Sequence, residues 1–231
     1  MQPIETRDPV VATTAAAAAE SPDAAPRRGT RPKPGERRVH ILQTLASMLE
    51  TPRGEKITTA ALAARLNVSE AALYRHFASK AQMYEGLIDF IEQTLFQLIN
   101  QIVAKEPSGA LQARAIALML IQFSAKNAGM TRVLTCEALV GEHERLAERV
   151  NQMLDRIEAT LRQCLRVSLA EQAQAAGGTA EGRLSKTGYD PAVRANLLVR
   201  YVIGCWHRYA QSGFKRSPSE HADEQIRVIL Q

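Results

Sequence analysis

The sequence is poor in aromatic residues and cysteine, and it has no long hydrophobic run. Phe, Trp and Tyr make up 5% of the 231 residues, and only three cysteines are present. Because no stretch of 18 or more apolar residues occurs, a transmembrane helix is not expected. The first 26 residues also lack the apolar core of a secretory signal. The scattered cysteines, Cys136, Cys164 and Cys205, therefore predict free thiols in a reducing cytoplasm.

Motifs of catalysis are missing as well. The sequence has no Gly-rich phosphate loop, no G-x-S-x-G, no H-E-x-x-H and no paired acid and base motif. Segment 142–144 (Glu-His-Glu) with Cys136, and Cys205 close to His207, contain metal-ligand types. Neither set offers four ligands at a familiar spacing, so surface and core roles are the simpler interpretation. We expect neither an enzyme nor a bound metal or cofactor.

Positive charge is concentrated in one quarter of the chain. Residues 27–80 hold 11 Lys and Arg against 4 Asp and Glu, whereas the remaining sequence has a small acidic excess. Such a concentration favours a polyanionic partner, with nucleic acid ahead of an anionic membrane. A basic face that only keeps the protein soluble is the alternative.

Apolar spacing predicts an all-α protein. Residues 1–35 contain six of the ten prolines and no apolar periodicity, which is typical of a disordered arm, here with a basic end. From residue 36 onward, apolar side chains recur at steps of three and four, the period of a helix. The expected helices are 36–50, 60–66, 70–77, 80–106, 111–126, 131–140, 142–174, 191–211 and a short one at the end of the chain.

Two short helices with a tight turn between them, after a longer helix and within the basic segment, describe a helix-turn-helix. Thr58, or its neighbour Thr59, is a suitable N-cap for the first helix, and Ser69 for the second. Asn67 suits the turn because asparagine tolerates a left-handed backbone. The long helix at 80–106 begins at the capping box Ser79-Lys80-Ala81-Gln82.

The segments Ile57–Ala63 and Val68–Lys80 resemble the DNA-binding unit of TetR-type regulators. An aromatic residue, His-Phe and a later lysine are matched by Tyr74, His76, Phe77 and Lys80. Within that superfamily the chain is similar to the nucleoid occlusion factors, over roughly residues 36–231. Supporting segments are Leu87–Glu92, Thr131–Thr135, Arg156–Gln163 and Phe214–Arg216. The resemblance implies a helix-turn-helix domain at 36–82 and a helical dimerisation and partner-binding domain at 83–231.

The predicted DNA contacts follow from side-chain chemistry. Thr58 at a helix start can present its hydroxyl and backbone N–H groups to a phosphate. The candidates for base contacts in the major groove are Ser69, Ala71, Ala72 and His76. Phosphate contacts are expected from Tyr74 and Lys80. The basic cluster from Arg27 to Arg38, which includes Arg37, is expected to follow the backbone or to enter the minor groove. A core position for Tyr74, or a packing role for His76 at the helix end, is the alternative.

Dimerisation is expected to involve 191–211 and a neighbouring long helix, because TetR-type proteins are two-fold dimers. Leu198, Val202, Cys205 and Tyr209 form the apolar face assigned to this role, and Gly204 permits a close approach. Such a dimer predicts a pseudo-palindromic double-stranded DNA site with half-sites one helical turn apart.

The resemblance also implies that the division protein FtsZ is a partner, bound through its short C-terminal tail. A groove between helices 80–105 and 111–126 is the expected site. Leu87, Phe90 and Met119 would supply its apolar lining, while Lys126 and Asn127 would hold a carboxylate and backbone groups. Phe90 could instead be a core residue.

Two classes of function therefore remain. The first is a DNA-bound nucleoid occlusion factor that inhibits FtsZ assembly over the chromosome. The second is a ligand-responsive transcriptional repressor, which needs an internal pocket with converging polar groups. The apolar residues of 111–125 indicate a filled core, which argues mildly against a ligand, and the resemblance supplies most of the preference for the first class.

Overall fold

The computed structural model describes residues 35–51, 56–180 and 189–231. The predicted arm therefore lies outside the described residues, apart from Gly35. Every regular element within these ranges is helical, which confirms the all-α fold class. No described helix is long and apolar enough to cross a membrane. No group of three or more His, Cys, Asp and Glu side chains that could hold a metal occurs among the described residues.

The first three helices form the predicted helix-turn-helix unit. They are α1 (Glu36–Met48), α2 (Thr59–Arg65) and α3 (Glu70–Tyr74). Their shared core includes Ile41, Leu45, Leu62, Leu73 and Phe77, each no more than 2% exposed. The burial of these side chains holds the three short helices together, since helices of this length are marginal alone.

The predicted caps are confirmed at atomic level. The side-chain oxygens of Thr58, Ser69 and Ser79 accept the backbone N–H groups of Ala61, Ala72 and Gln82. The Gln82 side chain then accepts the N–H of Ala78 at 2.9 Å, so the box closes on the residue before the cap. Asn67 has a φ of 53°, the left-handed conformation expected for the turn.

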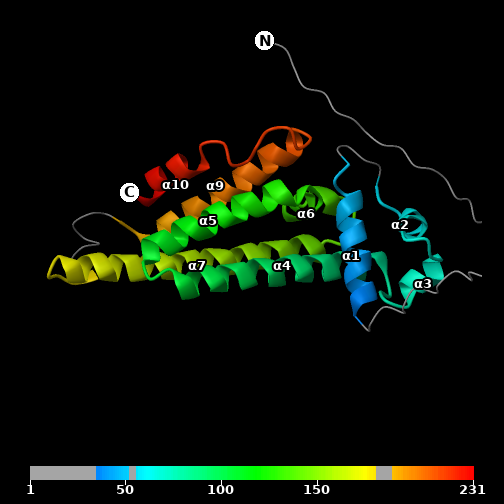
Figure 1. Cartoon of the computed structure of the whole chain (residues 1–231), viewed down its shortest axis with the longest axis horizontal. Helices are drawn as coiled ribbons and strands as arrows, with labels where there is room; N and C mark the ends of the chain where they lie inside the picture. The colour runs from blue at the N-terminus through cyan, green and yellow to red at the C-terminus, as the bar shows by residue number, and fades with distance from the viewer. Residues whose placement is uncertain (1–34, 52–55, 181–188) are drawn as a thin grey trace, which may run out of the picture. The chain divides into compact units, whose positions relative to one another are not determined.

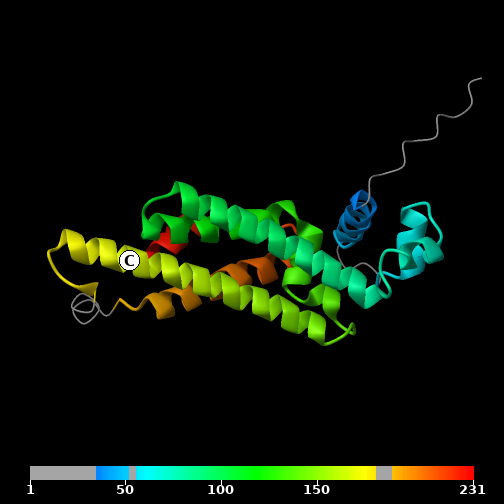
Figure 2. The ribbon, with the colours of Figure 1, turned by 90° about the horizontal axis from the view of Figure 1, so that it is seen from below.

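Five helices build the larger part of the molecule. They are α4 (Lys80–Lys105), α5 (Gly109–Lys126), α7 (Arg145–Ala175), α9 (Pro191–Gln211) and α10 (Ala222–Leu230). Figures 1 and 2 show α4 and α7 side by side, with α5 packed on both. Because α5 also contacts α9 and α10, most of its surface is enclosed. This position explains why its sequence is apolar on nearly all sides.

Some boundaries differ from those expected. Helix α3 ends at Tyr74 rather than at Phe77. In place of one helix over 131–140, the chain forms α6 (Ala128–Leu134) and the 3₁₀ helix η1 (Glu137–Leu139). Between them Cys136 has a φ of 59°, which interrupts the helical hydrogen bonding.

Candidate nucleic-acid interface and partner groove

The solvent side of α3 carries most of the predicted base contacts. Ser69, Ala71 and His76 are exposed, and Ala72 is half-buried. Tyr74 is 45% exposed, so the alternative of a core tyrosine is wrong. These side chains lie between positions 69 and 76, on α3 and directly beside its two ends, while Leu73 of the same helix is buried in the core. The structure therefore brings them together on one surface; their contacts with DNA remain a prediction.

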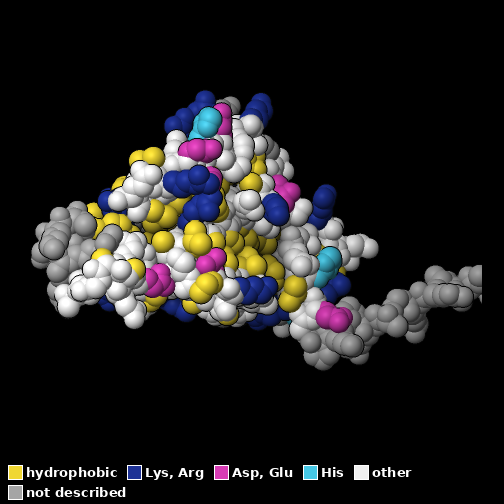
Figure 3. Space-filling view, turned by 60° about the vertical axis from the view of Figure 1, so that its left-hand side comes forward, with side chains coloured by type: hydrophobic (Ala, Val, Ile, Leu, Met, Phe, Trp, Pro, Cys, Tyr) yellow, Lys and Arg dark blue, Asp and Glu magenta, His cyan; other side chains and the backbone are white. Residues whose placement is uncertain are grey.

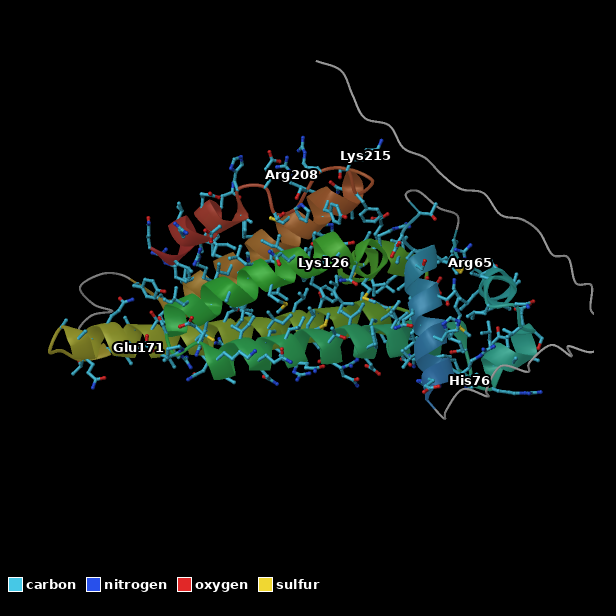
Figure 4. All side chains as sticks on the ribbon, in the orientation of Figure 1. Arg65, His76, Lys126, Glu171, Arg208 and Lys215 are labelled. Atoms are coloured by element: carbon cyan, nitrogen blue, oxygen red, sulfur yellow. The ribbon has the colours of Figure 1, made fainter. Side chains whose placement is uncertain are left out.

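Arg38 is exposed, and its side chain also has partners within the protein. Its guanidinium donates a 3.1 Å hydrogen bond to the backbone carbonyl of His76 and lies 4.2 Å from the centre of the Phe77 ring. This side chain therefore connects α1 to the turn that follows α3. Arg37 is half-buried in the same turn of α1. Figure 4 shows His76 at this end of the unit.

Lys80, which was predicted to contact a phosphate, has a partner within the protein; its contact with DNA stays a prediction. Its ammonium lies 2.6 Å from the Glu142 carboxylate, and its side chain is only 26% exposed. This pair was not predicted, because the two residues are 62 positions apart in the sequence. In this structure the charge of Lys80 is directed to a protein carboxylate.

One hydrogen bond within the helix-turn-helix unit was not predicted from the sequence. The hydroxyl of Thr59, on the first turn of α2, donates a 2.6 Å hydrogen bond to the carboxylate of Glu70. Glu70 is the first residue of α3. The bond therefore fixes the start of one helix against the start of the other. Since Thr58 is the N-cap, the hydroxyl of Thr59 was left for another partner, and this could have suggested the bond.

A surface groove of about 630 Å³ lies where α1, α4, α5 and α6 meet. Four of the five predicted partner residues line it, namely Phe90, Met119, Lys126 and Asn127. Phe90 is half-buried: it lines the groove and also packs against the hydrophobic core. Figure 4 shows Lys126 at the end of α5 that approaches α1. The contribution of α1 to the groove, through residues such as Ala46 and Ser47, was not predicted.

The fifth residue, Leu87, does not belong to the groove. Its side chain is 0% exposed and packs in the core with Ile88 and Ile91. Phe90, three positions later on the same side of α4, reaches the groove, whereas Leu87 is enclosed by the core. The assignment of Leu87 to the groove lining is therefore wrong.

The predicted dimer face of α9 is corrected in the same way. Leu198 and Val202 are no more than 1% exposed, and the neighbouring Trp206 donates its indole N–H to the Leu120 carbonyl. These residues form the inner face of the helix. The exposed apolar residues lie on another stripe, which comprises Val193 at 62%, Leu197 at 45%, half-buried Tyr201 and, on α10, Val228 at 67%. We call this stripe the α9–α10 apolar face.

Gly204 lies in the α9–α10 apolar face. A Cβ at this position would meet no atom within 4 Å, so its surroundings in one chain are open. On the side of the molecule drawn in Figure 3, hydrophobic side chains reach the surface between Lys and Arg side chains.

The three thiols are not activated. Burial raises the pKa of Cys136, Cys164 and Cys205 above the ordinary value. A raised pKa keeps each thiol protonated and a poor nucleophile near neutral pH. They behave as packing groups.

Comparisons with known proteins agree with this arrangement. The family described as "Bacterial regulatory proteins, tetR family" matches residues 55–87, and "Tetracyclin repressor-like, C-terminal domain" matches residues 109–231. The chain is 46% identical over 195 residues to a protein of Idiomarina loihiensis named nucleoid occlusion factor SlmA, covering 84% of this chain and 94% of that one. A Marinomonas protein with the same name is 45% identical over 199 residues, with coverage of 86% and 95%.

Solved structures share the fold at much lower identity. The fatty acid degradation regulator FadR of Bacillus halodurans matches with a TM-score of 0.66 at 12% identity, over 83% of this chain and 97% of that one. A structure titled AibR in complex with isovaleryl coenzyme A and operator DNA matches with a TM-score of 0.60 at 16% identity, with coverage of 84% and 97%. Both likenesses concern the fold alone.

Proposed function

The chain belongs to the SlmA family of TetR-type regulators, and from this premise we propose how it works as a nucleoid occlusion factor. It binds specific sites on the chromosome as a homodimer and captures FtsZ there, which inhibits the assembly of division filaments over the DNA. One observation supports this proposal above the others. The exposed helix α3 and the apolar groove occur in the same compact unit. Helix α1 lines the groove, and its Arg38 side chain is hydrogen-bonded to the carbonyl of His76, just after α3.

The DNA-reading part is residues 36–82, with α3 in the major groove. Ser69, Ala71, Ala72 and His76 face the bases, and Tyr74 contacts the backbone. Thr58 presents the start of α2 to a phosphate, and Arg37 adds charge from α1. The exposure of Thr58, Ser69, Ala71, Tyr74 and His76 supports the assignment, and Ala72 and Arg37 are half-buried.

The partner-binding part lies within 83–231 and uses the α1/α4/α5/α6 groove for the FtsZ tail. Phe90, Met119 and Met130 offer apolar contacts to a short peptide. Methionines suit such a surface because their side chains adapt to different occupants. Lys126 is exposed at the rim and can pair with a peptide carboxylate. The Asn127 amide already donates to the Phe123 carbonyl at 2.7 Å, which holds its side-chain oxygen in place to accept a peptide N–H.

The homodimer forms through the α9–α10 apolar face. Its exposed valine and leucine side chains are costly to leave in water, and a two-fold contact buries each of them against the same face of a second copy. Gly204 allows the two α9 helices to approach closely.

The ligand-responsive repressor makes a different demand on the bundle. It needs an internal pocket beside α5, where Ile116, Leu120 and Ile121 are no more than 1% exposed. These side chains occupy the space that a ligand would take, which supports the FtsZ-binding function instead.

Co-sedimentation with FtsZ tests the proposal. FtsZ is polymerised with nucleotide, and the purified protein is added with a duplex selected from random DNA or with a scrambled duplex. We expect the protein to pellet with FtsZ and to reduce the polymer mass, more strongly with the selected duplex. Absence of FtsZ binding under both conditions, with DNA selection intact, would replace this function by that of a repressor.

A further inference from the structure

One carboxylate from the C-terminal part receives two lysines of the DNA-reading unit. The Oε1 atom of Glu142 lies 2.6 Å from the ammonium of Lys80 and 3.5 Å from that of Lys56. Lys56 also donates a 3.1 Å hydrogen bond to the carbonyl of Gly141. The Glu142 side chain is only 10% exposed. A carboxylate removed from water to this extent depends on its cationic partners.

The two lysines occupy the two ends of the helix-turn-helix. Lys56 precedes Thr58, the N-cap of α2, and Lys80 is the first residue of α4, directly after the turn that leaves α3. Glu142 lies between η1 and α7, in the C-terminal part of the chain. The carboxylate therefore holds the chain where it enters α2 and where it leaves α3.

A buried aromatic ring lies beside the pair. Tyr84 is 1% exposed, and the Lys80 ammonium lies 5.7 Å from the centre of its ring. The ammonium is thus directed toward the junction between the two parts of the chain. Its charge is satisfied there before any DNA is bound.

We propose that Glu142 is a positioning residue for DNA recognition, which clamps both ends of the helix-turn-helix through Lys56 and Lys80. It does not touch DNA; it sets the orientation of α2 and α3 relative to the C-terminal part. Lys80 acts through this clamp and does not neutralise a phosphate. The inference rests on the DNA-binding half of the proposed function.

The opposite assignment gives opposite results. If Lys80 leaves Glu142 to contact a phosphate, Glu142 competes with DNA for the lysine. Replacement of the carboxylate would then release the lysine, tighten DNA binding and steepen its dependence on salt. The clamp predicts weaker binding with the same dependence on salt.

The test compares Glu142→Gln, Lys80→Met and the double variant in the whole chain. Affinity for a selected duplex is measured at several salt concentrations. We expect each single variant to bind roughly tenfold more weakly with an unchanged salt slope, and the double variant to be no weaker than either. Glu144→Gln is the matched control, since Glu144 is exposed and two positions away; its binding should equal that of the parent.

Two results would overturn the clamp. One is tighter DNA binding by Glu142→Gln, and the other is a salt slope reduced by about one in Lys80→Met, the mark of a lost phosphate contact.

Hydrogen exchange provides a measurement that needs no DNA. Amides of α2 and α3 should exchange faster in Glu142→Gln than in the parent, while those of α9 stay unchanged. Unchanged exchange in α2 and α3 would also contradict the clamp. If the parent selects no DNA sequence, the DNA-binding proposal fails, and this exchange result still decides whether Glu142 restrains the unit.

Discussion

Gly129 of α6 lies directly against the backbone of Ala46 in α1. A Cβ at position 129 would be 1.9 Å from the Ala46 carbonyl oxygen, and 3.2 Å from the Cβ of Leu49. The two helices can therefore touch only because residue 129 has no side chain. The same helices form one side of the partner groove, so the contact sets how the DNA-reading unit meets the groove.

Replacement of Gly129 by alanine should separate these helices. Because backbone cannot move aside like a flexible side chain, we expect a loss of about 1–3 kcal/mol in the free energy of unfolding. The gain in helix propensity, about 1 kcal/mol, offsets only part of it. Urea unfolding measures the change. A Gly129→Ala protein as stable as the parent would show that α1 and α6 are not in backbone contact.

Variants of Phe90 and Leu87 should separate groove from core. Phe90→Ala is expected to abolish co-sedimentation with FtsZ while folding and DNA binding remain. Leu87→Ala should instead lower the free energy of unfolding by about 2–5 kcal/mol, because it leaves a cavity in the core.

Lys126→Glu should also abolish FtsZ binding by reversing the charge at the rim of the groove. Lys105→Glu is its matched control, since Lys105 is an exposed lysine at the end of α4, outside the groove. Retention of FtsZ binding by both Phe90→Ala and Lys126→Glu would remove the groove from the proposal.

Deletion of residues 1–34 should weaken DNA binding through charge alone. The deletion removes four of the six basic residues between Arg27 and Arg38. We expect the affinity to fall most at low salt, with little change in base preference, because phosphate neutralisation does not depend on sequence. Fluorescence anisotropy on selected and scrambled duplexes measures this. The melting temperature should stay within a degree or two of the parent's, and a large decrease would assign the segment to the folded core.

Substitution of Leu197 by arginine should dissociate the dimer. Leu197 is 45% exposed in the α9–α10 apolar face, and two-fold symmetry would place the new charges of both copies in one interface. Sedimentation velocity should show a monomer, and affinity for a two-half-site duplex should fall by at least tenfold. Val140→Arg makes the same change at a 76% exposed valine outside this face and should remain a dimer. A dimeric Leu197→Arg protein would place the interface elsewhere.

Tyr84 should make the stability sensitive to alkaline pH. Burial, and secondly the Glu142 carboxylate, raise the pKa of this phenol to about 12 from an ordinary 10.0. Folding therefore favours the protonated form. Its contribution to the free energy of unfolding is complete below pH 10 and is lost as the pH rises through 12; the total is about 2–3 kcal/mol. Urea unfolding between pH 8 and 12 should show a smaller decline for Tyr84→Phe than for the parent. Equal declines would mean that the phenol has the same pKa in both states.

Local sequence signals determined the helices and the helix-turn-helix unit. Capping residues, the turn at Asn67 and the three-to-four spacing act over a few residues, so they are legible without knowledge of the fold. The inward position of Leu73 places Ala71 and Tyr74 on the outer side of α3, whereas Ser69 and His76 lie beyond the ends of the helix and owe their exposure to the fold.

Tertiary packing decided what the spacing left open. Helix α9 has apolar residues on two stripes, and only its contacts with α5 and α7 bury the one with Leu198 and expose the one with Leu197. On α4, burial on two sides removed Leu87 from the groove and left Phe90 at the surface. The partner of Lys80 was equally beyond the sequence, since charge attraction depends on distance in space, and only the fold brings Glu142 to 2.6 Å.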